Sequence, residues 1–138
     1  MSDDRPTILF VCVHNAGRSQ MAAGLARKLG GDRVVVRSAG SDPGDAVNPA
    51  AVEAMSEIGI DIHDAAPRLL ETDSVRAADV IVTMGCGDAC PHVPAKHRYD
   101  WQIPDPRDMD PDAFRGVRDL IESQVRALLA SLGARDAQ

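Results

Sequence analysis

Short runs of branched apolar residues alternate with helix-forming segments along the chain, and this alternation constrains the fold more than any other feature. The runs cover residues 7–13, 33–40 and 79–85, and a weaker run with the character of an edge strand covers residues 97–103. Such runs are typical of buried strands. Because strands that alternate with helices form βαβ units, we expect an α/β protein with a parallel sheet covered by helices on both faces.

The helix-forming segments carry start and stop signals. Residues 19–30 end at a pair of glycines, and residues 48–59 begin with Asn48 as a cap and Pro49 at the first helical position. The last helix opens at Asp110 and Pro111, and its apolar stripe comprises Phe114, Val117, Leu120 or Ile121, Val125, Leu128 and Leu132. No repeat or linker interrupts the pattern, so we expect residues 1–138 to form a single domain.

Composition excludes several function classes. The net charge of -6 argues against a nucleic-acid binder, and the aromatic content of 3% argues against a stacking platform for single strands. No segment approaches the ~20 apolar residues that span a bilayer, and the acidic start is unlike a signal peptide. We therefore expect a cytoplasmic protein with no membrane partner, whose three cysteines are reduced at rest and are catalytic or metal-binding.

The stretch "CVHNAGRS" carries the most specific chemical signal. It lies between the first strand and the first helix, at the end of a sheet where ligands collect in α/β proteins. Its pattern is Cys-x5-Arg-Ser. Cys12 is the candidate nucleophile, and the Arg18 guanidinium can donate two parallel hydrogen bonds to a tetrahedral oxyanion. The positive field of a helix N-terminus favours the thiolate form of Cys12. Neither an ATP-binding loop nor a dinucleotide fingerprint is present.

Backbone N–H groups of this loop are expected to form an oxyanion nest. Asn15 and Gly17 tolerate the left-handed conformations that a tight cradle needs, and Ser19 can either donate to the thiolate or cap the helix. The alternative without a function is a buried cysteine near a helix start, with a solvated arginine. The residues expected to bind the oxyanion are Val13, His14, Asn15, Ala16, Gly17, Arg18 and Ser19.

A general acid is needed to protonate the oxygen that leaves the oxyanion. Asp105 in "PDPRD" is the best candidate, because the flanking prolines stiffen its loop. The alternative is an ordinary acidic turn, and the rival acids are Asp100, Asp108 and Asp110.

Two further cysteines, Cys86 and Cys90, follow the third strand and are expected at the same sheet end as Cys12. In a helical segment their Cα atoms would be about 6 Å apart, which a disulfide can bridge. They would form a thiol relay, in which Cys86 attacks the Cys12 adduct and Cys90 then attacks Cys86. The rival hypothesis is a zinc site with His92, but the ligand spacing is unusual for zinc, and we expect no metal.

Together these motifs resemble the arsenate reductases built on the low-molecular-weight tyrosine phosphatase fold. The resemblance rests on "CVHNAGRSQMA", "RSAG", "VNPAAVEAM", "DVIVTMGCGDACP" and "DPRD", and extends from Ile8 to about Leu132. It implies three layers with a four-stranded parallel sheet. It also implies Cys12 as the nucleophile on arsenate, Arg18 and Ser19 as stabilising groups, and Asp105 as the general acid.

The resemblance further implies that Cys86 and Cys90 end as an exposed disulfide, which thioredoxin reduces with electrons from thioredoxin reductase and NADPH. No bound cofactor is expected, and we expect a monomer whose partners are arsenate and thioredoxin. Two alternatives stay open. A low-molecular-weight protein tyrosine phosphatase shares Cys12, Arg18 and Asp105 but has aromatic residues near the acid, where this chain has only Tyr99 and Trp101 nearby. The other alternative is a reductase linked to mycothiol and mycoredoxin, a branch that resembles sequences with a single cysteine more than it resembles this chain.

Overall fold

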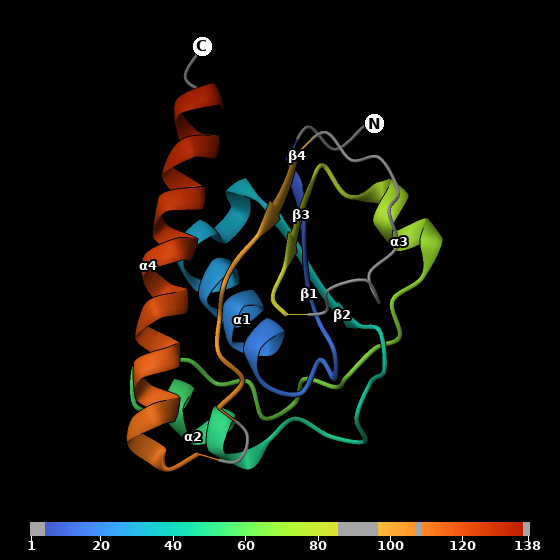
Figure 1. Cartoon of the computed structure of the whole chain (residues 1–138). Coiled ribbons are helices and arrows are strands. Elements are labelled where there is room, and N and C mark those ends of the chain that lie inside the picture. Colours follow the sequence, from blue (N-terminus) through green and yellow to red (C-terminus); the bar gives the residue numbers. More distant parts are fainter. Residues whose placement is uncertain (1–4, 86–96, 107–108, 137–138) are drawn as a thin grey trace.

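The computed structural model describes residues 5–85, 97–106 and 109–136, and four parallel strands form its centre. They are β1 (Thr7–Cys12), β2 (Val35–Gly40), β3 (Val80–Thr83) and β4 (His97–Asp100). Their order in the sheet is β2-β1-β3-β4, so β4 takes the edge position predicted for it (Figure 1). The expected parallel sheet is confirmed.

Helices cover both faces of the sheet, as the alternation of strands and helices predicts (Figure 1). On one face lie α1 (Arg18–Gly30), α2 (Pro49–Ser56) and α4 (Pro111–Asp136). The shorter α3 (Thr72–Ala77) lies on the other face. A 3-10 turn at Gly31–Arg33 follows α1 and delays the second strand by two residues relative to its predicted start.

The central strand β1 is anchored from both sides. Ile8 and Phe10 face the core under α1 and α4, whereas Leu9 and Val11 face the core under α3, and each of the four is at most 1% exposed. Burial of each such side chain contributes about 1.5–3 kcal/mol. The strand therefore holds Cys12, its last residue, at a fixed point at the carboxyl end of the sheet.

The long helix α4 packs through the predicted apolar stripe. Ile121 is fully buried and Leu120 is 38% exposed, which settles the alternative between them. Asp110 accepts a hydrogen bond from the Ala113 N–H at 2.9 Å, as expected of a cap. Asn48 caps α2 in the same way through Ala50, but that helix ends at Ser56 rather than at residue 59.

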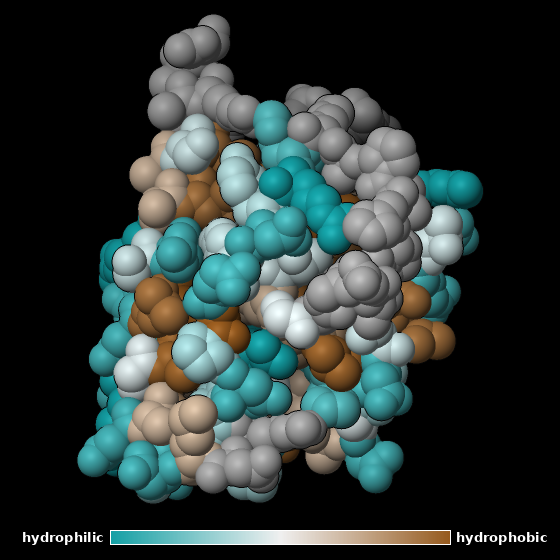
Figure 2. All heavy atoms as spheres, in the orientation of Figure 1, coloured by the Kyte–Doolittle hydropathy of each residue, from teal (hydrophilic) through white to brown (hydrophobic). Residues whose placement is uncertain are grey.

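The surface of the face in Figure 2 is mostly hydrophilic, and apolar atoms appear there in small separate groups. Exposed apolar side chains include Leu69 and Met109, at 57% and 53% exposure. Single exposed apolar residues are normal on a protein surface and mark no site by themselves. Among the helices that the structure describes, none is long and apolar enough to cross a membrane.

Candidate active site

The site begins in the loop that joins the last residue of β1, Cys12, to the first residue of α1, Arg18. Four loop carbonyls face outward, toward the chain segment that follows β2. The backbone N–H groups of Ser41, Asp42, Gly44 and Asn48 donate to the carbonyls of Cys12, Val13, His14 and Ala16 over 3.3, 2.8, 2.9 and 2.7 Å. With its carbonyls held on the outside, the loop can present N–H groups to its interior.

This outer segment approaches the loop so closely that only glycine fits at its start. A Cβ atom on Gly40, the last residue of β2, would lie 2.6 Å from the Val13 carbonyl oxygen and 2.9 Å from the Asn15 backbone nitrogen. Gly40 thus lets β2 and the loop pack backbone against backbone.

Asn15 holds the middle of the loop in a left-handed conformation, with φ at 50° and no exposed surface. Its Oδ1 accepts from the Arg68 backbone N–H at 2.9 Å, which identifies the other amide atom as Nδ2. Nδ2 donates to Ser19 Oγ at 2.6 Å, so the Ser19 proton is free to point elsewhere. Cys12 Sγ lies 2.9 Å from Ser19 Oγ, so the hydroxyl donates to the sulfur when Cys12 is a thiolate, which has no proton to donate.

Two expectations about this loop are resolved by its geometry. Ser19 contacts the Cys12 sulfur and makes no cap; the cap position of α1 is Gly17, which provides no side-chain hydrogen bond. Of the two residues that tolerate a left-handed conformation, Asn15 adopts one, whereas Gly17 has φ at -137° and does not. Asn15 is the left-handed residue of this loop, which is otherwise held by hydrogen bonds from the segment that follows β2.

Gln20 belongs to the stretch "CVHNAGRSQMA" that carries the resemblance to arsenate reductases, but the sequence predicted no contact for it; in the structure it holds Asn15 through hydrogen bonds. It is 2% exposed, and its Nε2 donates to Asn15 O at 3.1 Å, to Asn15 Oδ1 at 3.2 Å and to Ala66 O at 3.2 Å. Gln20 therefore joins the loop to the segment around Ala66. A polar residue at a buried position of an Ala-rich helix was the available signal.

Arg18 lies beneath the loop that carries the candidate acid. Its Nη1 donates to Ile103 O at 3.1 Å, and its Nη2 lies 3.6 Å from Asp105 Oδ2. The arginine side chain is 8% exposed and the aspartate side chain is 36% exposed. The ion pair thus joins a buried cation to a carboxylate that solvent reaches.

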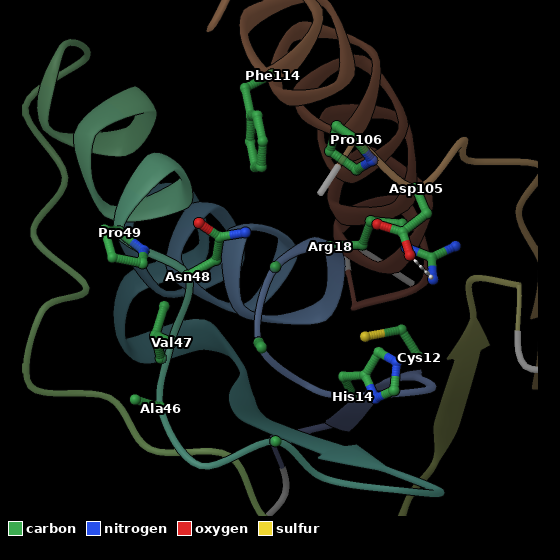
Figure 3. Close-up of a pocket in the computed structure, with 13 residues that line it drawn as sticks. Cys12, His14, Arg18, Ala46, Val47, Asn48, Pro49, Asp105, Pro106 and Phe114 are labelled. Carbon is green, nitrogen blue, oxygen red and sulfur yellow. Dashed lines mark ion pairs between the residues drawn. The ribbon is translucent and has the colours of Figure 1, made fainter. Parts of the chain in front are cut away.

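These groups line one pocket of about 510 Å³. Cys12, His14, Arg18 and Asp105 form its polar end, and Figure 3 shows the Arg18–Asp105 ion pair on the same wall. The apolar side chains of the pocket belong to Ala16, Ala46, Val47, Pro49, Pro106 and Phe114. The pocket therefore combines a thiol, a cation and a carboxylic acid with an apolar wall.

The family assignment follows from the comparison of this chain with known proteins. The family model described as low molecular weight phosphotyrosine protein phosphatase matches residues 7–138. The chain belongs to this family.

Relatives of this phosphatase-family chain include several arsenate reductases. Arsenate reductase 2 of Staphylococcus haemolyticus is 38% identical over 128 residues, which cover 90% of this chain and 96% of that protein. A thioredoxin-dependent arsenate reductase from Corynebacterium glutamicum superposes with a TM-score of 0.87 at 40% identity. The match covers 98% of this chain, which spans 65% of that one. The resemblance to arsenate reductases of the phosphatase-like family is confirmed.

A phosphatase is also among the similar structures. YwlE arginine phosphatase from Geobacillus stearothermophilus superposes with a TM-score of 0.86 at 26% identity, with 96% of each chain covered. The two chemistries thus share one fold, and the choice between them depends on residues.

The contacts of the candidate acids distinguish their roles. Asp105 lines the pocket, whereas Asp110 caps α4. Asp100 accepts from the Thr83 hydroxyl and lies 3.6 Å from Arg98 Nε. Asp108 lies outside the described residues. Of the three acids that the structure describes, Asp105 is therefore the one within reach of Arg18 and the pocket.

The relay cysteines, Cys86 and Cys90, and the candidate zinc ligand His92 lie outside the described residues. In the described part of the chain before them, β3 runs parallel to β1, and Thr83 pairs with Val11. Within residues 5–85, 97–106 and 109–136, no cluster of His, Cys, Asp and Glu side chains could hold a metal ion.

Phe114 is the pocket residue that sequence reasoning assigned to a different role. Its position in the apolar stripe of α4 indicates a core residue, and it is 2% exposed. In Figure 3 its ring points into the pocket from the first turn of the helix. Neither of the aromatic residues considered from the sequence, Tyr99 and Trp101, is among the lining residues.

Proposed function

We propose that this protein reduces arsenate to arsenite, with Cys12 as the nucleophile. The proposal is carried by the placement of Cys12 Sγ, which lines the pocket 2.9 Å from Ser19 Oγ and shares it with Arg18 and Asp105. A thiol held by a hydroxyl donor beside a guanidinium fork suits attack on a tetrahedral oxyanion. The relatives named arsenate reductase support arsenate as that oxyanion.

The loop and α1 hold arsenate in this proposal. The N–H groups of residues 13–19 and the Arg18 guanidinium surround its oxygens, and the outward carbonyls of the loop support this orientation. The hydrogen-bond chain from Arg68 through Asn15 to Ser19 ends at the sulfur, where it stabilises the Cys12 thiolate.

The chemistry then proceeds in three steps. The Cys12 thiolate forms a bond to arsenic, and one oxygen leaves as water with a proton from Asp105. The Cys86 thiolate attacks the Cys12 sulfur, and the electron pair of the As–S bond stays on arsenic, which becomes arsenite. Cys90 then attacks Cys86, which restores the Cys12 thiolate and leaves a Cys86–Cys90 disulfide. Two thiols thereby lose the two electrons that arsenic gains.

Thioredoxin is the proposed reductant of that disulfide, supplied by thioredoxin reductase and NADPH. The similarity to the thioredoxin-dependent Corynebacterium enzyme supports this choice. A cytoplasmic location is part of the proposal, since reducing conditions keep all three cysteines available. The enzyme is proposed to act as a monomer.

The decisive experiment follows NADPH oxidation with thioredoxin, thioredoxin reductase and arsenate. The parent protein should turn over, and the Cys12→Ser variant should not. The Cys86→Ser variant should complete no turnover, because it lacks the thiol that attacks the Cys12 adduct. The Cys90→Ser variant should stop after one turnover with a trapped Cys12–Cys86 disulfide, identified by mass spectrometry. If both variants turned over at the parent rate, the relay would be wrong. Faster turnover with mycothiol and mycoredoxin would replace thioredoxin as the reductant.

A second candidate is hydrolysis of an aryl phosphate, which the apolar wall of the pocket favours. Phe114, Val47 and Pro49 provide a surface for an organic group that arsenate does not need. An aryl phosphate should therefore be tested beside arsenate. A value of kcat/KM far above that for arsenate would make the protein a phosphatase, whereas slow residual hydrolysis would leave the reductase proposal intact.

A further inference from the structure

Gly85, the residue before Cys86, lies directly against the guanidinium of Arg18. A Cβ atom on Gly85 would lie 2.4 Å from Arg18 Nη1, 3.4 Å from Cζ and 3.6 Å from Nη2. Real Cβ atoms essentially never come closer than 3.0 Å to a non-bonded heavy atom. A side chain at position 85 would therefore require the backbone there or the Arg18 guanidinium to move.

Arg18 is enclosed on its other sides. Ile103 O accepts from Nη1 at 3.1 Å, and Asp105 Oδ2 lies 3.6 Å from Nη2. The guanidinium is the far end of a flexible side chain, whereas Gly85 is backbone near the end of a buried strand, so the guanidinium is the part that would move. A methyl group at position 85 therefore acts first on the alignment of Arg18.

We propose that Gly85 is a positioning residue: because it has no side chain, the Arg18 guanidinium can occupy the position from which it binds the oxyanion. The inference rests on the proposed function, in which Arg18 grips the oxyanion through two parallel hydrogen bonds. Rotation of the guanidinium plane weakens this binding strongly, because both hydrogen bonds depend on one orientation of the group. Arg18 is the functional group, and Gly85 acts through it.

A matched control exists, because Gly85 is also left-handed, with φ at 84°. An alanine there is strained whatever the space around it. Gly59 has nearly the same φ, 80°, but a Cβ atom on Gly59 would meet no neighbouring atom within 4 Å. Gly59→Ala thus reports backbone strain alone, and Gly85→Ala reports strain together with displacement of Arg18.

The test is titration of each variant with inorganic phosphate by calorimetry, with thermal unfolding as the check on folding. Both alanine variants should lose stability. Gly85→Ala should bind phosphate roughly tenfold to hundredfold more weakly than the parent, the range expected for loss of hydrogen bonds to a charged group. Gly59→Ala should bind phosphate with the parent affinity. In steady-state assays the Gly85 variant should show a raised KM for arsenate.

The inference is overturned if a folded Gly85→Ala variant binds phosphate as tightly as the parent, and the proposed function then still stands. Failure of the parent itself to bind phosphate or arsenate would instead remove the proposed function. A third comparison uses the Arg18→Ala background, titrated to high phosphate concentration. There, Gly85→Ala should cause no further loss of affinity, and an equal further loss would show that Gly85 does not act through Arg18.

Discussion

Asp105 and Arg18 form an ion pair on one wall of the pocket, with Oδ2 and Nη2 3.6 Å apart. The pair links the loop after β4 to the first residue of α1, so the proposed acid is held beside the group that grips the oxyanion. In the proposed mechanism, this position lets Asp105 protonate the oxygen that leaves the oxyanion.

Asp105→Asn should lower kcat/KM for arsenate by about a hundredfold, because general acids contribute roughly 10²- to 10⁴-fold to rate. The matched control is Asp110→Asn. Asp110 caps α4 in the same part of the chain, and asparagine is an equally good cap. Steady-state kinetics of both variants checks the prediction, and an Asp105→Asn enzyme at the parent rate would contradict the assignment of the acid.

Ser19→Ala should make Cys12 less reactive. The substitution removes the hydroxyl 2.9 Å from Cys12 Sγ and ends the hydrogen-bond chain from Asn15. Alkylation of Cys12 by iodoacetamide at neutral pH should slow roughly tenfold, the effect of one hydrogen bond to a charged group. The measurement uses mass spectrometry in a background that lacks Cys86 and Cys90.

Ser41→Ala is the control for that experiment. The Ser41 hydroxyl is buried and has no hydrogen-bond partner among the described residues, although its backbone N–H donates to the Cys12 carbonyl. Loss of an unpaired hydroxyl leaves nothing unsatisfied, so alkylation should proceed at the parent rate. Equal slowing in both variants would mean that Ser19 has no specific effect on the sulfur.

Gly40→Ala should disrupt the loop from outside. The new methyl group would meet the Val13 carbonyl at 2.6 Å, and neither backbone can yield as a side chain does. We expect a loss of about 1–3 kcal/mol in the free energy of unfolding, together with weaker phosphate binding. Gly44→Ala is the control, since its Cβ would meet neighbours only at 3.8 Å and beyond. Urea unfolding and phosphate titration distinguish the two variants.

Much of this site could be predicted because its signals are local. The run from Ile8 to Cys12, the abrupt polar turn and the apolar spacing after it specify a strand, a loop and a helix in that order. The Cys-x5-Arg spacing then places both groups around one loop. Asp105 could be predicted as the best candidate acid but not separated from its three rivals, because its neighbourhood depends on how the loop after β4 returns over α1.

Other features leave little trace in the sequence. The segment after β2 holds the loop through backbone N–H groups, which every residue except proline provides, so Ser41 to Asn48 carry no motif for that role. Phe114 satisfies the periodicity of α4 and lines the pocket as well, since the helix begins beside the pocket. Periodicity identifies a buried face without showing which part of that face borders a cavity.

Gln20→Leu should destabilise the fold by about 2 kcal/mol, because it leaves the buried Asn15 carbonyl without its side-chain donor. Gln102 is exposed, and Gln102→Leu should change stability by less than about 0.5 kcal/mol. Urea unfolding of the two variants checks this. A Gln20→Leu protein as stable as the parent would show that Gln20 is not needed to hold Asn15.

Gln20→Glu adds a test with a definite sign. A carboxylate at this position would face carbonyl oxygens, so folding should raise the pKa of the introduced acid. The protonated form can still donate one hydrogen bond. Relative to the parent, the variant should therefore be more stable at pH 5 than at pH 8, and the opposite trend would contradict the contacts seen here.

Glu57 should make the stability of the parent depend on acid pH. Hydrogen bonds from Arg115 and then from Arg118 hold the pKa of Glu57 below its ordinary value, and they join the end of α2 to α4. A carboxyl group whose pKa is lowered by folding stabilises the protein above the pKa of the unfolded chain. That contribution is lost as the pH falls through the lower, folded value. Urea unfolding should thus show Glu57→Gln to be less stable than the parent at pH 7, with the difference shrinking as the pH falls below the pKa of the unfolded chain. A difference that stayed constant down to pH 3 would show that the charge of Glu57 does not link the two helices.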